Sequence, residues 1–181
     1  MRPTQTREAA YAAASLPARM VFALARLGGA VSALLIVLVL GIVIYAIFQR
    51  YGMHTPLLWG DEVIGYLLVA IVMFGAAEAL RQEDHISINL VSAGAGPKLA
   101  FVLRLWFDLA VLIVAVILGW STWQAIRFAY DFGSYSAGSI EIATWIPQVP
   151  MLIGAGLLGL VAAMRMGESI RRSPIRRKNP R

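Results

Sequence analysis

The chain has 181 residues, of which 59% are hydrophobic and only 14% are charged, whereas soluble domains carry about 25% charged residues. A soluble fold of this size could not bury so much apolar surface, so the composition indicates a protein that crosses the membrane several times. The chain has no cysteine, which excludes disulfides, thiolate metal sites and thiol catalysis.

Residues 1–26 form an N-terminal segment that is rich in arginine. Pro17 suits the first turn of a helix, and beyond it apolar residues fall on one helical face while Arg19 and Arg26 share another. This pattern predicts a short amphipathic helix at the membrane surface over residues 17–26. The alternative is a frayed tail, and we expect disorder before about residue 8.

Four apolar stretches are long enough to cross a hydrocarbon core of about 30 Å. The first has no charge, the third can start at Pro97, and the fourth carries Pro147 and Pro150 in its first turns, where proline costs least. The predicted spans are residues 27–48, 61–80, 99–128 and 145–166, within a membrane domain of residues 27–166 that is followed by a basic tail, 167–181.

The positive charges lie almost entirely on one side of these spans. Fourteen of the 16 Lys and Arg residues lie within residues 1–26, 81–104 and 165–181, and the other two are Arg50 and Arg127. Cytoplasmic segments carry the excess of Lys and Arg. The sequence therefore predicts an all-α membrane protein with four transmembrane helices and both termini in the cytoplasm.

Acidic residues frame the non-cytoplasmic start of the second span. Asp61 and Glu62 follow Trp59, and these three residues are candidates for docking a partner. A simpler interpretation is that acids favour a helix N-terminus, where the helix dipole is positive. Adjacent carboxylates point in different directions on a helix, which argues against a two-carboxylate catalytic site.

Other ionisable residues gather near the cytoplasmic ends of the second and third spans. Intramembrane charges usually face protein or water and pair with one another. The candidates for a structural polar network across helices are Glu78, Arg81, His85, Arg104 and Asp108. A proton relay is the alternative. The two histidines, His54 and His85, fall on opposite sides of the membrane and cannot jointly bind a metal or a haem.

Small residues and the basic tail complete the pattern. Small residues spaced by four permit close helix approach. The candidates for helix packing are Gly75, Ala79, Ala155, Gly159 and Ala163. The basic tail is typical of an electrostatic anchor to anionic lipids rather than of a nucleic-acid site.

Several motifs taken together resemble the small membrane subunit, or Q-type subunit, of tripartite ATP-independent periplasmic (TRAP) transporters. The resemblance covers about residues 27–166. It rests on Arg50, Trp59-Gly60-Asp61-Glu62, Gly75-Ala76, Arg81, His85-Ile86, Trp145, Pro147 and Pro150.

The resemblance implies a subunit of the bacterial inner membrane that is not an enzyme and holds no cofactor. Its partners would be a large multi-span subunit with the substrate and sodium sites, and a periplasmic protein that delivers a solute, an organic acid. The small subunit would scaffold the large one during ion-driven symport. The competing hypothesis is a stand-alone four-helix transporter or channel that uses Glu78 and Asp108.

Overall fold

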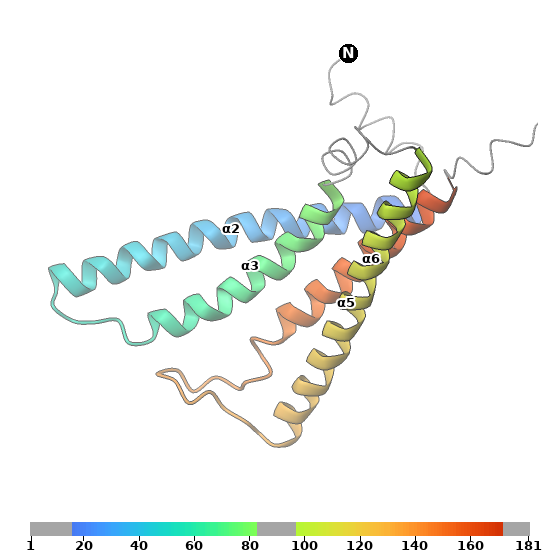
Figure 1. Cartoon of the computed structure of the whole chain (residues 1–181). Coiled ribbons are helices and arrows are strands. Elements are labelled where there is room, and N and C mark those ends of the chain that lie inside the picture. Colours follow the sequence, from blue (N-terminus) through green and yellow to red (C-terminus); the bar gives the residue numbers. More distant parts are fainter. Residues whose placement is uncertain (1–15, 83–96, 172–181) are drawn as a thin grey trace, which may run out of the picture.

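The computed structural model describes residues 16–82 and 97–171, and these ranges fold into long α-helices (Figure 1). In chain order they are α2 (Leu16–Gly52), α3 (Gly60–Gln82), α5 (Pro97–Asp131) and α6 (Val149–Arg171). Each is long and apolar enough to cross a membrane. The β-structure in the described ranges is one isolated bridge, Tyr135 to Ala143. The prediction of an all-α protein with four spans is confirmed.

The helices converge at one end of the molecule and spread apart at the other (Figure 1). We call the first the closed end, where α2 and α5 begin and α3 and α6 end, and the second the open end. Helix α6 packs against α2, α3 and α5, and α2 also packs against α3. Both described chain ends, Leu16 and Arg171, lie at the closed end (Figure 1). The structure thus puts them on one side of the membrane, and the assignment of that side to the cytoplasm stays a prediction.

Helix α2 includes the segment that we expected to form a separate surface helix. It is continuous over 37 residues, about 55 Å, so residues 17–26 are its first turns. Within these turns Ala18 and Ala25 are buried in the chain, whereas the apolar side chains of Met20 and Leu24 are exposed. Small side chains let α2 approach the bundle closely. A position of these turns at the membrane surface stays a prediction.

The core lies at the closed end and consists mostly of small side chains. Its buried members are Val21, Ala25, Ala77, Leu80, Val161 and Ala162. Helices α3 and α6 approach each other closely at Gly154, where an added Cβ would lie 2.9 Å from backbone atoms of Met73. Because a Cβ has no room there, the crossing of α3 and α6 requires glycine on α6.

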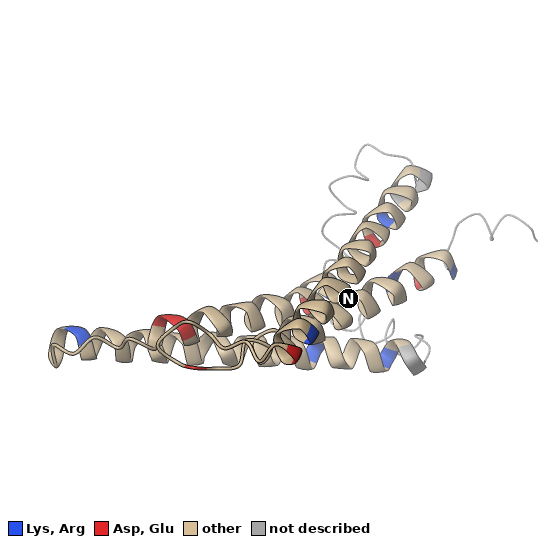
Figure 2. Cartoon of the chain, turned by 90° about the horizontal axis from the view of Figure 1, so that it is seen from below, with Lys and Arg blue, Asp and Glu red and all other residues tan. Residues whose placement is uncertain are grey.

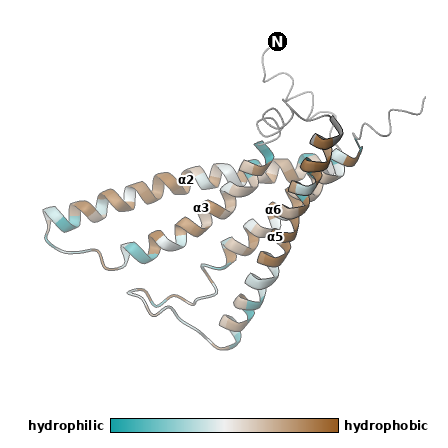
Figure 3. Ribbon diagram, in the orientation of Figure 1, coloured by the Kyte–Doolittle hydropathy of each residue, from teal (hydrophilic) through white to brown (hydrophobic). Residues whose placement is uncertain are grey.

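Outside this core, many large apolar side chains are exposed, and long stretches of the helices are hydrophobic (Figure 3). In the most apolar stretch of each helix, between 6% and 28% of the residues are buried inside the chain. Such faces are stable only against lipid or against another membrane protein. The fold therefore leaves most of its apolar surface for an environment that the chain does not supply.

The sequence suggested that the last helix begins near Trp145, but α6 begins at Val149. Residues 145–148 form turns in which the Gln148 N–H donates to the Trp145 carbonyl at 3.2 Å. Proline disfavours a helical conformation in the residue before it, so Pro147 delays the helix, whereas Pro150 sits in its first turn. The helix then continues to Arg171, five residues beyond the expected end.

The tight crossing gives a first prediction. We expect Gly154→Ala to destabilise the bundle by about 1–3 kcal/mol, because the new methyl group would overlap Met73. Thermal unfolding of the detergent-solubilised chain, followed by size-exclusion fluorescence, measures the effect. The matched control is Gly156→Ala on the same helix, where nothing lies within 4 Å of the added Cβ. Equal melting temperatures for the two variants would contradict the proposed close contact.

Candidate functional site

A buried ion pair joins three helices at the closed end. The Arg165 Nε of α6 lies 3.1 Å from Asp108 Oδ1 of α5, and the side chains are 5% and 0% exposed. Arg165 Nη1 also donates to the Leu80 carbonyl near the end of α3. Arg104, one turn before Asp108, adds a second favourable charge interaction. We call these four residues the closed-end cluster.

A second pair, between Glu78 and Arg81, lies within α3. Arg81 Nη2 is 2.5 Å from Glu78 Oε1, Arg81 Nε donates to Oε2 at 2.6 Å, and Gln82 Nε2 donates to Oε1 at 2.6 Å. The aliphatic part of Glu78 packs against α2 where Gly29 leaves space, since a Cβ there would lie 2.6 Å from Glu78 Cγ. The Glu78 carboxylate is therefore held by its own helix.

The predicted polar network thus divides into two groups. Glu78 pairs within α3, whereas Asp108 pairs across helices with Arg165, which the sequence analysis counted among the positive charges but did not include in the network. A signal for Arg165 existed, because Met164 and Met166 flank it and the helical pattern continues to Ile170. His85 lies outside the described residues.

A third polar group, which we call the open-end cluster, consists of Glu62, Tyr66, Ser136 and Ile140. Ser136 Oγ donates to Glu62 Oε1, and the Ile140 N–H donates to Glu62 Oε2 at 3.2 Å. Tyr66 Oη lies 2.7 Å from Glu62 Oε1 and 2.9 Å from Ser136 Oγ. Ser136 and Ile140 were not recognised in the sequence, because a carboxylate does not reveal which loop will reach it.

The three docking candidates therefore differ in accessibility. The Glu62 carboxylate is occupied by the connection between α5 and α6, whereas Asp61 is exposed and Trp59 is 41% exposed. Trp59 also precedes α3, and its carbonyl accepts the Val63 N–H at 3.2 Å. Asp61 and Trp59 are thus exposed at the open end, and their role in docking a partner stays a prediction.

The packing candidates also occupy different positions. On α6, Ala155 is buried near Gly119 of α5. Gly159 faces Ala115 of α5, and a Cβ added at Gly159 would lie 3.4 Å from the Ala115 Cβ. On α3, Gly75 faces Ser32 of α2, whose hydroxyl donates to the Ile71 carbonyl at 2.9 Å. Ala163 is half-buried, and Ala79 lies on the exposed side of α3.

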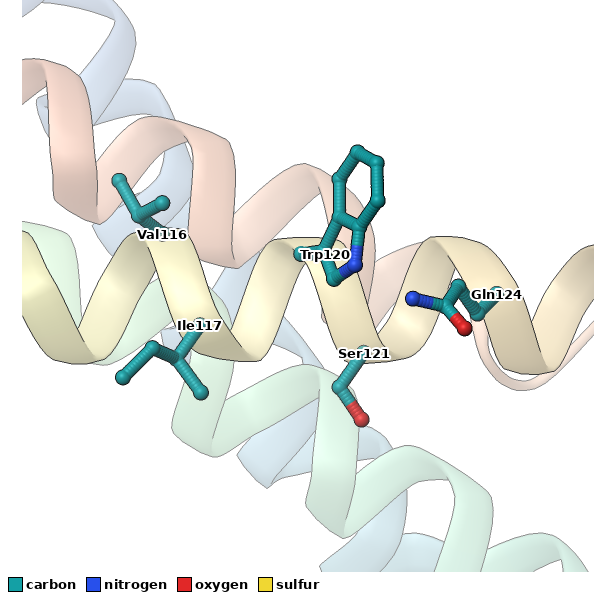
Figure 4. Close-up of a pocket in the computed structure, with 5 residues that line it drawn as sticks. All are labelled: Val116, Ile117, Trp120, Ser121 and Gln124. Atoms are coloured by element: carbon teal, nitrogen blue, oxygen red, sulfur yellow. The ribbon is translucent and has the colours of Figure 1, made fainter.

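An open groove of about 420 Å³ runs along α5 (Figure 4). Its lining residues all belong to this helix and are Val116, Ile117, Trp120, Ser121 and Gln124. In residues 16–82 and 97–171, no group of three His, Cys, Asp or Glu residues could hold a metal ion. The closed-end and open-end clusters described above join helices and loops.

Charged residues lie toward the helix ends, and long intervening stretches of helix carry none (Figure 2). With four apolar helices, this arrangement defines a polytopic membrane protein. Residues 39–172 match the family described as tripartite ATP-independent periplasmic transporters, DctQ component, and the chain belongs to this family. It is accordingly an inner-membrane transporter component and not an enzyme, as the sequence motifs suggested.

Two curated relatives are similar to parts of the chain. The sialic acid TRAP transporter small permease protein SiaQ of Vibrio cholerae is 26% identical over 92 residues, which cover 49% of this chain and 53% of that protein. The sialic acid TRAP transporter permease protein SiaT of Haemophilus influenzae is 33% identical over 58 residues, or 32% of this chain and 9% of that protein. The matches thus span about half of the first relative and a small part of the second.

The closed-end cluster gives a second prediction. Asp108→Asn leaves the buried Arg165 without its counter-charge, and removing one partner of such a pair costs about 3–5 kcal/mol. We expect a lower melting temperature and less assembled protein in the membrane. Asp108→Leu combined with Arg165→Met removes both charges and should recover most of the loss.

The control for this series is Asp131→Asn, an exposed acid at the other end of α5, which should change stability by no more than about 0.5 kcal/mol. A fully assembled Asp108→Asn protein that has lost transport would contradict a structural role for the pair.

Proposed function

We propose that this chain is the small permease subunit of a TRAP-type secondary transporter. In this proposal it scaffolds a large ion-coupled subunit that takes up an organic acid delivered by a periplasmic binding protein. Family membership supports the class of protein. The scaffold role is supported by the outward-facing apolar surface, because each helix leaves most of its apolar stretch uncovered by the chain itself.

The distribution of charge supports the assignment of the solute pathway to another subunit. Residues 27–49, 63–77, 109–126 and 149–164 contain no charged side chain, so the middle of every span is apolar. An ion-coupled pathway needs polar groups at that depth. We assign the substrate and sodium sites to the large subunit. We also propose that the large subunit attaches to the apolar faces of the four helices.

The open and closed ends would face different compartments. The excess of Lys and Arg at the closed end supports a cytoplasmic location, with anionic lipid headgroups near the basic tail. The open end would then face the periplasm. Asp61 and Trp59, which are exposed there, would meet the binding protein.

A stand-alone transporter based on Glu78 and Asp108 has less support. The two carboxylates do not share a site, because Glu78 is bound by Arg81 and Gln82 of its own helix and Asp108 is bound by Arg165. A coupling carboxylate must be able to bind its ion during the cycle, whereas both of these carboxylates already face a basic side chain of the same chain.

Reconstitution gives the third prediction. Proteoliposomes that contain this chain together with its co-purified large partner, plus the binding protein and an inward sodium gradient, should accumulate the solute. Liposomes with this chain alone should show no uptake above protein-free liposomes. Solute uptake by the chain alone would overturn the scaffold role, and a chain that co-purifies with no large membrane partner would argue against the subunit assignment.

Two substitutions at opposite ends of α3 give the fourth prediction. Asp61→Lys reverses a charge at the open end, and we expect it to raise the concentration of binding protein that gives half-maximal uptake while complex yield is retained. Arg81→Ala removes the partner of Glu78 at the closed end, and we expect it to lower complex yield. Unchanged uptake and complex yield in both variants would contradict the docking role of Asp61 and the assembly role of Arg81.

A further inference from the structure

The open end depends on few contacts between its two halves. Helices α2 and α3 form one hairpin and α5 and α6 form another, and the two hairpins meet closely at Gly154 and Met73 and at the closed-end cluster. Toward the open end, α3 and α6 move apart (Figure 1). The open-end cluster spans this separation, since Glu62 belongs to the first hairpin and Ser136 and Ile140 belong to the connection in the second.

The connection has a defined shape of its own. Thr144 donates to the Ser134 carbonyl through its N–H at 3.0 Å and its hydroxyl at 2.9 Å, and the Ser136 N–H donates to the Ile142 carbonyl at 2.8 Å. Residues 134–144 are thereby closed into a loop, which we call the 134–144 loop. Internal hydrogen bonds close the loop but do not set its position relative to α3.

The Glu62 carboxylate provides that position. Each of its oxygens accepts a hydrogen bond from a different part of the loop: Oε1 from the Ser136 hydroxyl and Oε2 from the Ile140 N–H. Hydrogen bonds to an ionised group are stronger than those between neutral groups. Tyr66, one turn further along α3, contacts both Glu62 and Ser136 and so limits how far the carboxylate can move.

Gly138 is an independent sign that the loop is shaped around this carboxylate. A Cβ added at Gly138 would overlap both oxygens of Glu62, although the glycine itself is exposed. Gly138 also donates its N–H to Ser136 Oγ at 3.4 Å. The tip of the loop therefore rests directly on the acid, and no larger residue fits between them.

We propose that Glu62 is a positioning residue that latches the 134–144 loop to the start of α3, and so ties the two helical hairpins together at their open end. Glu62 then acts through the loop and does not itself contact a partner. The consequence for transport rests on the proposed function: the latched loop would keep its exposed residue Tyr135 at the open end, where Asp61 and Trp59 are also exposed for docking.

The test uses pulsed electron paramagnetic resonance on the full chain in lipid nanodiscs. The chain has no cysteine, so spin labels can be placed at Leu58→Cys beside α3 and Tyr135→Cys in the loop, both strongly exposed positions. We expect a single narrow distance distribution in this background. Glu62→Ala should widen it by about two-fold or more, because the loop loses both hydrogen bonds to the carboxylate and keeps only the contact of Ser136 with Tyr66.

Two pairs of variants make the result specific. Asp61→Ala removes the exposed neighbouring acid and should leave the distribution narrow. Gly138→Ala should widen it through the overlap with Glu62, whereas Gly65→Ala, with nothing within 4 Å of the added Cβ, should not. If Glu62→Ala does not fold, the comparison of Gly138→Ala with Gly65→Ala still tests whether the loop rests on Glu62. The latch would be overturned if the distance distribution stayed narrow in Gly138→Ala and in any folded Glu62→Ala protein. It would also be overturned if Asp61→Ala widened the distribution as much as Glu62→Ala does.

Uptake measurements separate the latch from the proposed function. In the reconstituted complex, Glu62→Ala should raise the concentration of binding protein that gives half-maximal uptake more than it lowers the maximal rate. A purely structural defect would instead lower the maximal rate with the yield of complex. If Glu62→Ala widens the distance distribution but leaves uptake unchanged, the result supports the latch and contradicts the docking role of the open end.

Discussion

The buried contact of Arg165 with Asp108 and with the Leu80 carbonyl is the interaction on which the rest of the bundle depends. It joins α3, α5 and α6 at one point, through side chains that are almost completely removed from solvent. A charge in this environment needs a partner, so the three helix ends have one favourable arrangement. With this end fixed, the spread of the helices toward the open end is a consequence of their crossing geometry.

Packing in the bundle uses small residues. Lipid tails are as apolar as leucine, so the hydrophobic effect does not drive helices together in a bilayer, and close van der Waals contact must do so instead. Gly154 against Met73 and Gly29 against Glu78 bring backbones close, and the core around them is rich in alanine. Large apolar side chains such as Leu34, Trp106 and Ile117 point outward instead. Small residues therefore make most of the close contacts between helices, whereas many large apolar side chains face the surroundings of the chain.

The two ends of the molecule use polar groups differently. At the closed end, an ion pair shielded from solvent joins helices that already pack together. At the open end, Glu62 binds a loop across a separation that apolar packing does not bridge, and its partners are a hydroxyl and a backbone amide. The first arrangement joins three helices to one another, whereas the second joins one helix to a loop.

The number of spans, the all-helical class and the family could be read from the sequence, because span length, hydropathy and short motifs are local properties. Pro97 at the start of α5 and the acids at the start of α3 were also found in this way. The partners of Asp108 and Glu62 and the buried face of α2 were decided by the tertiary structure alone. Ser136 lies 74 residues from Glu62 and Leu80 lies 85 residues from Arg165, and such pairings depend on which helices become neighbours.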